Sequence, residues 1–257
     1  MSDRAVSYEI RNDVCILKIL GPPTDENNLM QLSYQLSDFC NEVNAKGELR
    51  VVVVADASGD ALGFKKEMFA GHTVIHEMPT EKGRSLAEPI SNIDRPVIAA
   101  ITGDALGMGL ELVLGCDIRI AAETSHFGMP HVKENMIPRD GGTQRLSRLV
   151  GRGKALEMTL TGRQIDAREA QRIGLVNKLA PKEAVMTAAE EMANEMASKG
   201  PISLRYTKEA VNKGMDMTLE QGLRLEADLY MLIHTTVDRE EGIRAFQEKR
   251  MPEFKGE

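Results

Sequence analysis

The chain has 257 residues, of which 28% are charged and 42% are hydrophobic, and its 39 acidic against 32 basic residues give a formal net charge of −7. This acidic balance argues against a nucleic-acid-binding protein, and the hydrophobic fraction is enough for a folded core and argues against disorder. No apolar run approaches the roughly 18 residues that cross a bilayer, and the opening Met-Ser-Asp-Arg-Ala is not the start of an apolar signal, so we expect no membrane segment and a cytoplasmic location.

The first part of the chain alternates between predicted strands and helices. We expect a hairpin with strands over 6–11 and 14–20 and an Asn-Asp turn between them, followed by an amphipathic helix over 28–45. The run of four valines in 51–55 is too short for a helix and suits a strand that is buried on both faces. Farther along, the predicted strands are 97–101 and 118–122, and the predicted helices are 109–115 and 142–150. This alternation predicts a layered α/β core.

Beyond residue 151 the strand signals fade, apart from 174–178. Helices are expected over 181–199, 218–232 and 238–250. No Pro/Gly/Ser-rich linker divides the chain, so we predict an α/β core over residues 1–195 and a helical C-terminal region over 196–257. That region would act as a lid or as a contact between subunits. The cysteines Cys15, Cys40 and Cys116 have neither metal-ligand nor disulfide spacing and are expected to be reduced and mostly buried.

The densest local signal lies between residues 96 and 117, where a strand runs into a glycine-rich turn and then a helix. The backbone N–H groups around Gly107, Met108 and Gly109 would lie at the helix N-terminus, where they lack intrahelical partners and can receive negative charge. This is the arrangement of an oxyanion hole. Glu111 follows on the same helix face, at i+3 from Met108. Such turns are also common tight connections, and a lone glutamate on a short helix is more often exposed, so spacing alone leaves both interpretations open.

Residues 98–122, which read Ile-Ala-Ala-Ile-Thr-Gly-Asp-Ala-Leu-Gly-Met-Gly-Leu-Glu-Leu-Val-Leu-Gly-Cys-Asp-Ile-Arg-Ile-Ala-Ala, resemble the signature of the enoyl-CoA hydratase/isomerase (crotonase) family. Further matches follow in family order, at 127–130, 137–146, 160–162, 167–177 and 241–250. The resemblance implies an α/β fold, a spiral of ββα repeats with a helical C-terminal trimerisation region, and a homotrimer or a homohexamer built as a dimer of trimers. It also implies an acyl-CoA thioester as substrate, with coenzyme A arriving as part of that substrate and no separate cofactor or metal.

The resemblance further implies that backbone N–H groups hold the thioester carbonyl while an enolate forms at the α-carbon. One donor would be Met108. The other would be Gly63 or Leu62, because the loop before Lys65 is shorter than usual and lacks the familiar Gly-Ala-Asp. The acyl-CoA phosphates or adenine would meet Lys65 and Lys66, or Lys249 and Arg250 from a neighbouring subunit. Each of these cations is otherwise a solvated surface charge.

Typical hydratases of the family use a pair of glutamates. Glu111 matches the first, but the position after the proline of the Phe-Gly-x-Pro motif holds His131 in place of the second. A histidine can transfer protons near neutral pH, so His131 is a candidate acid or base beside Glu111; the alternative is a structural histidine that lines a widened pocket. Asp140, one position from an aspartate that isomerases often carry, is a further candidate, or else the N-cap of the 142–150 helix.

The leading prediction is therefore an enoyl-CoA hydratase, a lyase that adds water to an unsaturated acyl-CoA thioester. The changed second acid favours an unusual substrate, such as a cyclic or dienoyl thioester. The alternatives are an enoyl-CoA double-bond isomerase, a ring-opening β-oxoacyl-CoA hydrolase and, in a different class, a non-catalytic binding protein.

Overall fold

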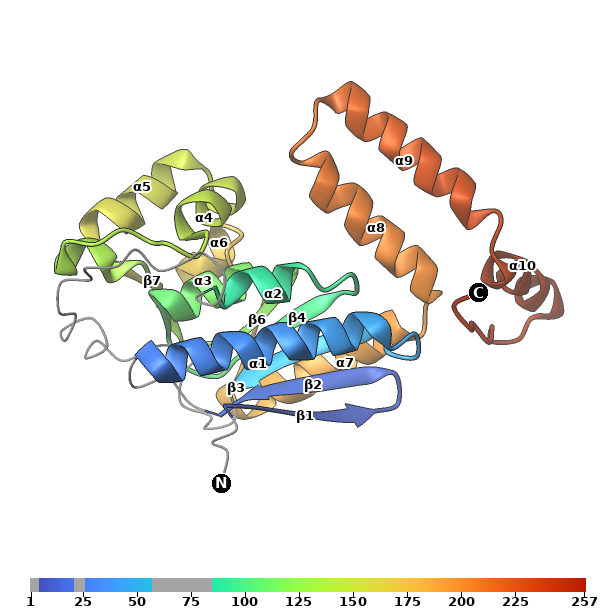
Figure 1. Cartoon of the computed structure of the whole chain (residues 1–257), viewed down its shortest axis with the longest axis horizontal. Helices are drawn as coiled ribbons and strands as arrows, with labels where there is room; N and C mark the ends of the chain where they lie inside the picture. Colours follow the sequence, from blue (N-terminus) through green and yellow to red (C-terminus); the bar gives the residue numbers. More distant parts are fainter. Residues whose placement is uncertain (1–4, 21–25, 57–84) are drawn as a thin grey trace.

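The computed structural model describes residues 5–20, 26–56 and 85–257, and within them the chain is built around a mixed β-sheet (Figure 1). The strand order is β1-β2-β3-β4-β6-β9. β1 (Val6–Arg11) and β2 (Val14–Ile19) form an antiparallel hairpin, whose turn places Asn12 at a φ of 54°, a conformation that asparagine tolerates. The other strands join in parallel: β3 (Val51–Asp56), β4 (Val97–Ile101), β6 (Ile118–Ala122) and β9 (Lys178–Ala180).

Helices cover both faces of this sheet, and the valines of β3 show why the run is continuous. Val52 and Val54 pack into the cluster under α1 (Glu26–Ala45), α2 (Ala87–Ser91) and α3 (Met108–Leu114). Val51 and Val53 pack on the other face, against α7 (Val185–Ala197). A strand between two helical layers has no solvent-facing side, so every position favours an apolar residue.

A smaller sheet lies beside the first, in the order β5-β7-β8, with bounds Ala105–Leu106, His126–Gly128 and Gln164–Asp166. Around it lie the 3₁₀ helix η2 (Pro130–Glu134), α4 (Gly142–Val150), α5 (Arg152–Thr161) and α6 (Ala167–Arg172). The Gly107 amide donates to the Gly128 carbonyl at 2.9 Å. This pairing brings the glycine-rich turn before α3 next to the Phe-Gly-Met-Pro segment.

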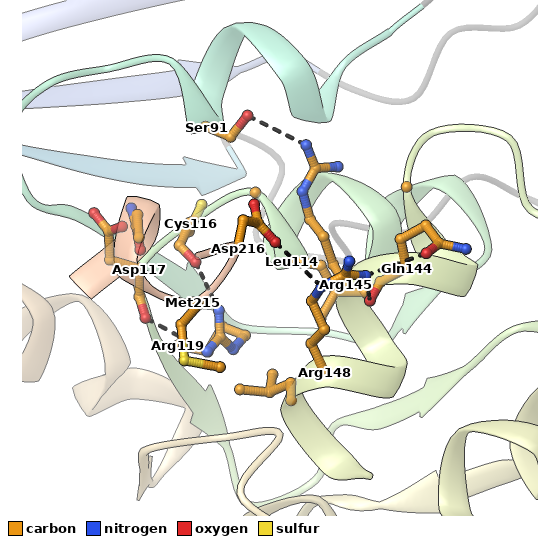
Figure 2. A pocket seen from close by; sticks show the side chains of 14 residues that line it. Ser91, Leu114, Cys116, Asp117, Arg119, Gln144, Arg145, Arg148, Met215 and Asp216 are labelled. Carbon is orange, nitrogen blue, oxygen red and sulfur yellow. Dashed lines mark hydrogen bonds and ion pairs between the residues drawn. The ribbon is translucent and has the colours of Figure 1, made fainter. Parts of the chain in front are cut away.

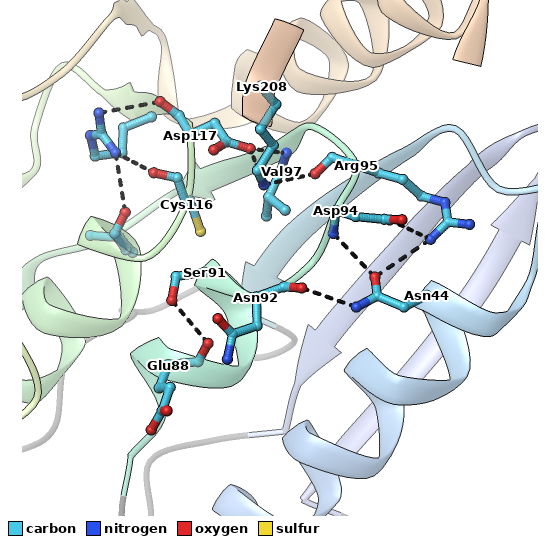
Figure 3. Close-up of polar contacts among 12 residues, drawn as sticks. Asn44, Glu88, Ser91, Asn92, Asp94, Arg95, Val97, Cys116, Asp117 and Lys208 are labelled. Carbon is cyan, nitrogen blue, oxygen red and sulfur yellow. Dashed lines mark hydrogen bonds and ion pairs between the residues drawn. The ribbon is translucent and has the colours of Figure 1, made fainter. Parts of the chain in front are cut away.

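The C-terminal region is helical, as expected. α8 (Pro201–Gly214) and α9 (Leu219–Ile233) form a hairpin that projects from the sheet, and α10 (Val237–Glu248) lies beyond it (Figure 1). Lys208 of α8 bonds the core through the Asp117 carboxylate at 2.7 Å and the Arg95 carbonyl at 2.9 Å (Figure 3). The predicted boundary at residues 195/196 falls in the last turn of α7. No helix in the described ranges is both long and apolar enough to cross a membrane.

The strands predicted at 6–11, 97–101 and 118–122 and the helix at 142–150 match the structure to the residue. The strand predicted at 174–178 is wrong, because Gly174 has a φ of 79° and the Leu175 and Val176 amides both donate to the Ala170 carbonyl, closing the end of α6. β9 begins only at Lys178. The helix expected from 181 opens instead with the 3₁₀ helix η3 (Lys182–Ala184). The sequence patterns also missed α2, α5, α6 and α8.

Candidate active site

Glu111 is fully buried in the middle of α3. The helix starts after Gly107, whose φ of 55° and ψ of −122° suit a residue without a side chain. Glu111 Oε1 accepts hydrogen bonds from the Asp140 amide at 2.7 Å and the Gly142 amide at 3.0 Å. Burying a carboxylate costs free energy, and these two hydrogen bonds offset part of that cost. The interpretation of Glu111 as an exposed helix residue is wrong.

His131 faces the other oxygen of the same carboxylate. It lies on η2, is 4% exposed, and its Nε2 is 3.4 Å from Glu111 Oε2. No described residue donates a hydrogen bond to Glu111 Oε2, so this oxygen keeps its capacity to accept a proton. His131 therefore lies beside Glu111, and its role as an acid or base stays a prediction. A carboxylate and an imidazole within reach of each other can move protons to and from a bound molecule.

Met108 is the first residue of α3, so its amide has no carbonyl to bond one turn earlier in the helix. The Gly107 amide before it is already used by Gly128. The geometry on this side therefore suits the predicted anion-binding role. The second predicted donor, Gly63 or Leu62, and the predicted coenzyme A contacts Lys65 and Lys66 lie outside the described residues.

Asp140 is buried, with 6% of its surface exposed, and its side chain points toward α2. Its carboxylate accepts hydrogen bonds from Ser85 Oγ at 2.5 Å and from the Leu86 and Ala87 amides at 2.7 and 2.9 Å. Burial raises the pKa of the Asp140 carboxyl, and these hydrogen bonds act against that rise. The interpretation of Asp140 as the N-cap of α4 is wrong: the cap residue is Gly141, in the left-handed conformation, and Asp140 lies one residue outside it.

The C-terminal cations lie away from this pair within the subunit. Lys249 ends α10, which Figure 1 shows on the far side of the molecule from α3. Arg250 bonds the Glu241 carboxylate at 2.6 Å and the Glu248 carboxylate at 2.6 Å. Arg250 therefore has a structural role in its own chain, and a contact of Lys249 with a neighbouring subunit's ligand stays a prediction.

A cavity of about 610 Å³ separates α4 from the turn between α8 and α9 (Figure 2). Arg148 Nε and Asp216 Oδ1 approach across it at 3.7 Å, and Arg145 reaches Ser91 Oγ at 3.2 Å. Neither Glu111 nor His131 is among the described residues that line it. The candidate chemistry therefore lies at the Glu111–His131 pair and not in this cavity.

The chain matches known proteins over nearly its whole length. The sequence model of the enoyl-CoA hydratase/isomerase family matches residues 9–257. The 2,3-dehydroadipyl-CoA hydratase of Escherichia coli (strain K12) is 34% identical and covers 100% of both chains, and the short-chain-enoyl-CoA hydratase of Clostridium acetobutylicum is 35% identical over 95% of both. The crystal structure of an enoyl-CoA hydratase from Bacillus anthracis is similar with a TM-score of 0.88 and 36% identity, covering 99% of this chain and 100% of that one.

These similarities and the architecture confirm the predicted crotonase fold with its helical C-terminal region. The chain belongs to the enoyl-CoA hydratase/isomerase family and is one of its enzymes.

Proposed function

We propose that the protein is an enoyl-CoA hydratase, a lyase that adds water across the 2,3 double bond of an unsaturated acyl-CoA. The observation that carries this proposal is the buried Glu111 carboxylate. Its Oε1 accepts hydrogen bonds from two backbone amides, and its Oε2 lies 3.4 Å from His131 Nε2. Hydration needs a proton taken from water and a proton given to the α-carbon, and this pair offers a group for each transfer. Relatives that carry hydratase names support the proposal.

In the proposed reaction, Glu111 takes a proton from water while the water oxygen bonds to the β-carbon. The electron pair of the double bond shifts toward the thioester carbonyl and leaves an enolate. The amides of Met108 and Gly63 donate hydrogen bonds to the enolate oxygen. His131 gives a proton to the α-carbon and is reprotonated from Glu111, so one molecule of water is consumed and both side chains return to their starting states.

The substrate is proposed to be a cyclic or dienoyl thioester. An imidazole ring is bulkier and more rigid than the carboxylate it replaces, and it presents its nitrogen in a different direction. Because His131 would stand beside the β-carbon of the substrate, this replacement favours an acyl group of a different shape around that carbon. Coenzyme A enters as part of the thioester, and the proposed steps use no further cofactor or metal.

The test is turnover of crotonyl-CoA, 3-enoyl-CoA, a cyclic dienoyl-CoA and a cyclic β-oxoacyl-CoA in H₂¹⁸O, with products identified by mass spectrometry. A hydroxyacyl product that carries ¹⁸O supports the proposal. A shifted double bond without solvent oxygen would establish the isomerase instead, and an opened ring with ¹⁸O in a new carboxylate, from a cyclic β-oxoacyl-CoA, would establish the hydrolase. Glu111→Gln should lower kcat by roughly 10²- to 10⁴-fold, whereas the exposed Glu123→Gln should leave kcat unchanged.

We also propose a homotrimer, or a dimer of trimers, located in the cytoplasm. Leu219, Leu223 and Tyr230 fall on one face of α9 and are between 55% and 79% exposed. A face of large apolar side chains is typical of a contact between subunits. Light scattering of the purified protein should give three or six times the chain mass, and a monomer at micromolar concentration would refute this part of the proposal.

A further inference from the structure

Asp140 forms hydrogen bonds with residues of α3 and α4 and with the start of α2, through both its backbone and its side chain. Its amide donates to Glu111 Oε1 at 2.7 Å, and its carbonyl accepts from Arg145 Nη1 at 2.9 Å. Its carboxylate accepts from Ser85 Oγ and from the amides at the start of α2. The residue whose backbone holds Glu111 is thus itself held by its side chain.

The support on the α2 side is buried and closely packed. Leu86, Ala87 and Ile90 are completely buried, and Ser33 Oγ bonds the Ser85 carbonyl at 2.8 Å. A Cβ on Gly115 would lie 2.7 Å from the Ala87 carbonyl oxygen, which shows how closely α2 packs against the end of α3. An anchor in closely packed structure moves little, because protein interiors lack the free volume that movement requires.

We propose that Asp140 is a positioning residue: its carboxylate, fastened to α2, fixes its own backbone N–H and thereby orients the Glu111 carboxylate toward His131. The inference rests on the proposed role of Glu111. Most of the acceptor positions of the Asp140 carboxylate are already used by Ser85, Leu86 and Ala87, so it acts through Glu111 and not by transferring a proton itself. Catalysis is sensitive to such placement, because small displacements of a reacting group slow the reaction steeply.

The substitutions Asp140→Ala and Asp140→Asn separate positioning from proton transfer. Alanine removes all the side-chain contacts to α2. Asparagine cannot act as the acid, but its oxygen can accept from the Leu86 and Ala87 amides and its NH₂ can donate to Ser85 Oγ. Asp166→Ala is the matched control, because Asp166 caps α6 by accepting from the Glu169 amide and has no contact with Glu111. For each variant, kcat and KM, the thermal midpoint and the ¹³Cε1 NMR signal of His131 are measured.

We expect Asp140→Ala to lower kcat by roughly 10- to 100-fold, with KM changed by less than about 3-fold, and Asp140→Asn to recover most of kcat. The His131 signal should move in Asp140→Ala, since the neighbouring carboxylate is displaced, and stay in place in Asp140→Asn and Asp166→Ala. If Asp140→Ala does not fold, Ser85→Ala is used instead; it removes one hydrogen bond to the Asp140 carboxylate and the one that Ser85 Oγ accepts from the Glu88 amide. It should show smaller changes of kcat and of the signal in the same direction.

An inactive Asp140→Asn with an unmoved His131 signal would overturn the proposal in favour of proton transfer by Asp140. Wild-type kcat and an unmoved signal in Asp140→Ala, or in Ser85→Ala where that variant is used, would overturn it outright. The NMR measurement needs no substrate, so it decides the positioning role even if the wild-type protein hydrates none of the tested thioesters and the proposed function fails.

Discussion

His131 Nε2 lies 3.4 Å from Glu111 Oε2, with both side chains shut off from bulk solvent. The two residues come from different elements, α3 and η2, which the β5–β7 pairing brings together. An imidazole at this distance from a buried carboxylate can exchange a proton with it, where two carboxylates would repel each other.

Replacing His131 should therefore slow the reaction and not only loosen the fold. We expect His131→Gln to lower kcat for hydration by roughly 10²- to 10³-fold, measured by the loss of enoyl-thioester absorbance. His126→Gln is the matched control, because His126 is exposed and pairs only with Asp104 among the described residues. If His131→Gln turned over substrate as fast as the wild type, His131 would be a structural histidine.

Gly142 has no room for a side chain, because Glu111 fills the space. A Cβ at this position would lie 2.8 Å from Glu111 Oε1 and 2.8 Å from Pro138 Cβ. Gly142→Ala should displace the carboxylate, lower kcat by about 10-fold or more, and cost about 1–3 kcal/mol of the free energy of unfolding. Gly153→Ala, in α5, is the matched control, because a Cβ at this position would have no neighbour within 4 Å. This variant should keep its activity and gain up to about 1 kcal/mol in the free energy of unfolding. Equal activity of the two variants would contradict this prediction.

Lys208 anchors the C-terminal helices to the core through Asp117 and the Arg95 carbonyl (Figure 3). The Lys208 side chain is 10% exposed, and Asp117 also accepts from the Val97 amide at 2.7 Å. Lys208→Met should cost about 1–3 kcal/mol in urea unfolding, since a partly buried carboxylate loses its cation. Lys213→Met, which breaks only an exposed pair with Glu209, should cost no more than about 0.5 kcal/mol. Indistinguishable urea midpoints for the two variants would refute the anchoring role.

The end of the chain should loosen in acid. Glu241 accepts from Arg250 and from the Glu253 amide and also bonds Arg244, and these contacts, with Arg250 first, hold the pKa of its carboxyl well below the usual value of 4.5. A lowered pKa in the folded state means that the stabilisation is present above the usual pKa and is lost as the pH falls below about 4.

Hydrogen exchange of the Glu253 amide, corrected for its intrinsic rate, should therefore accelerate in wild-type protein below that pH. In Glu241→Gln this amide should already exchange faster at pH 7, with less change in acid, whereas Glu240→Gln, at an exposed neighbouring position, should behave like the wild type. A slow amide in Glu241→Gln at pH 7 would show that the carboxylate does not hold this segment.

The cysteine thiols should be unreactive in the folded protein. Cys15, Cys40 and Cys116 are free and buried, and burial raises the pKa of each thiol to about 12. At pH 8 only ~10⁻⁴ of such a thiol is ionised, and the thiolate is the reactive form. Ellman's reagent should react slowly with native protein and release three equivalents of product in guanidinium chloride. Rapid release of even one equivalent from native protein would contradict the structure.

Local pattern determined much of the fold. The strands at 97–101 and 118–122 could be predicted to the residue because short β-branched or apolar runs between turns specify a buried strand without distant information. α8 was missed although Pro201 occupies its first turn, where proline commonly begins a helix. The strand expected at 174–178 does not form, because the Leu175 and Val176 amides donate to the Ala170 carbonyl and not to a neighbouring strand.

The amino-acid sequence by itself identified the family motifs and nominated Glu111, His131, Met108 and Asp140. Only the tertiary structure decided that Glu111 is buried, that His131 lies beside it, and that the Asp140 carboxylate holds α2 and not α4. The physical reason is distance along the chain. Helix caps and pairs of side chains that exchange protons depend on contacts between residues that can be far apart in the sequence. Leu86 lies 54 residues from Asp140, so no local sequence pattern could predict their hydrogen bond.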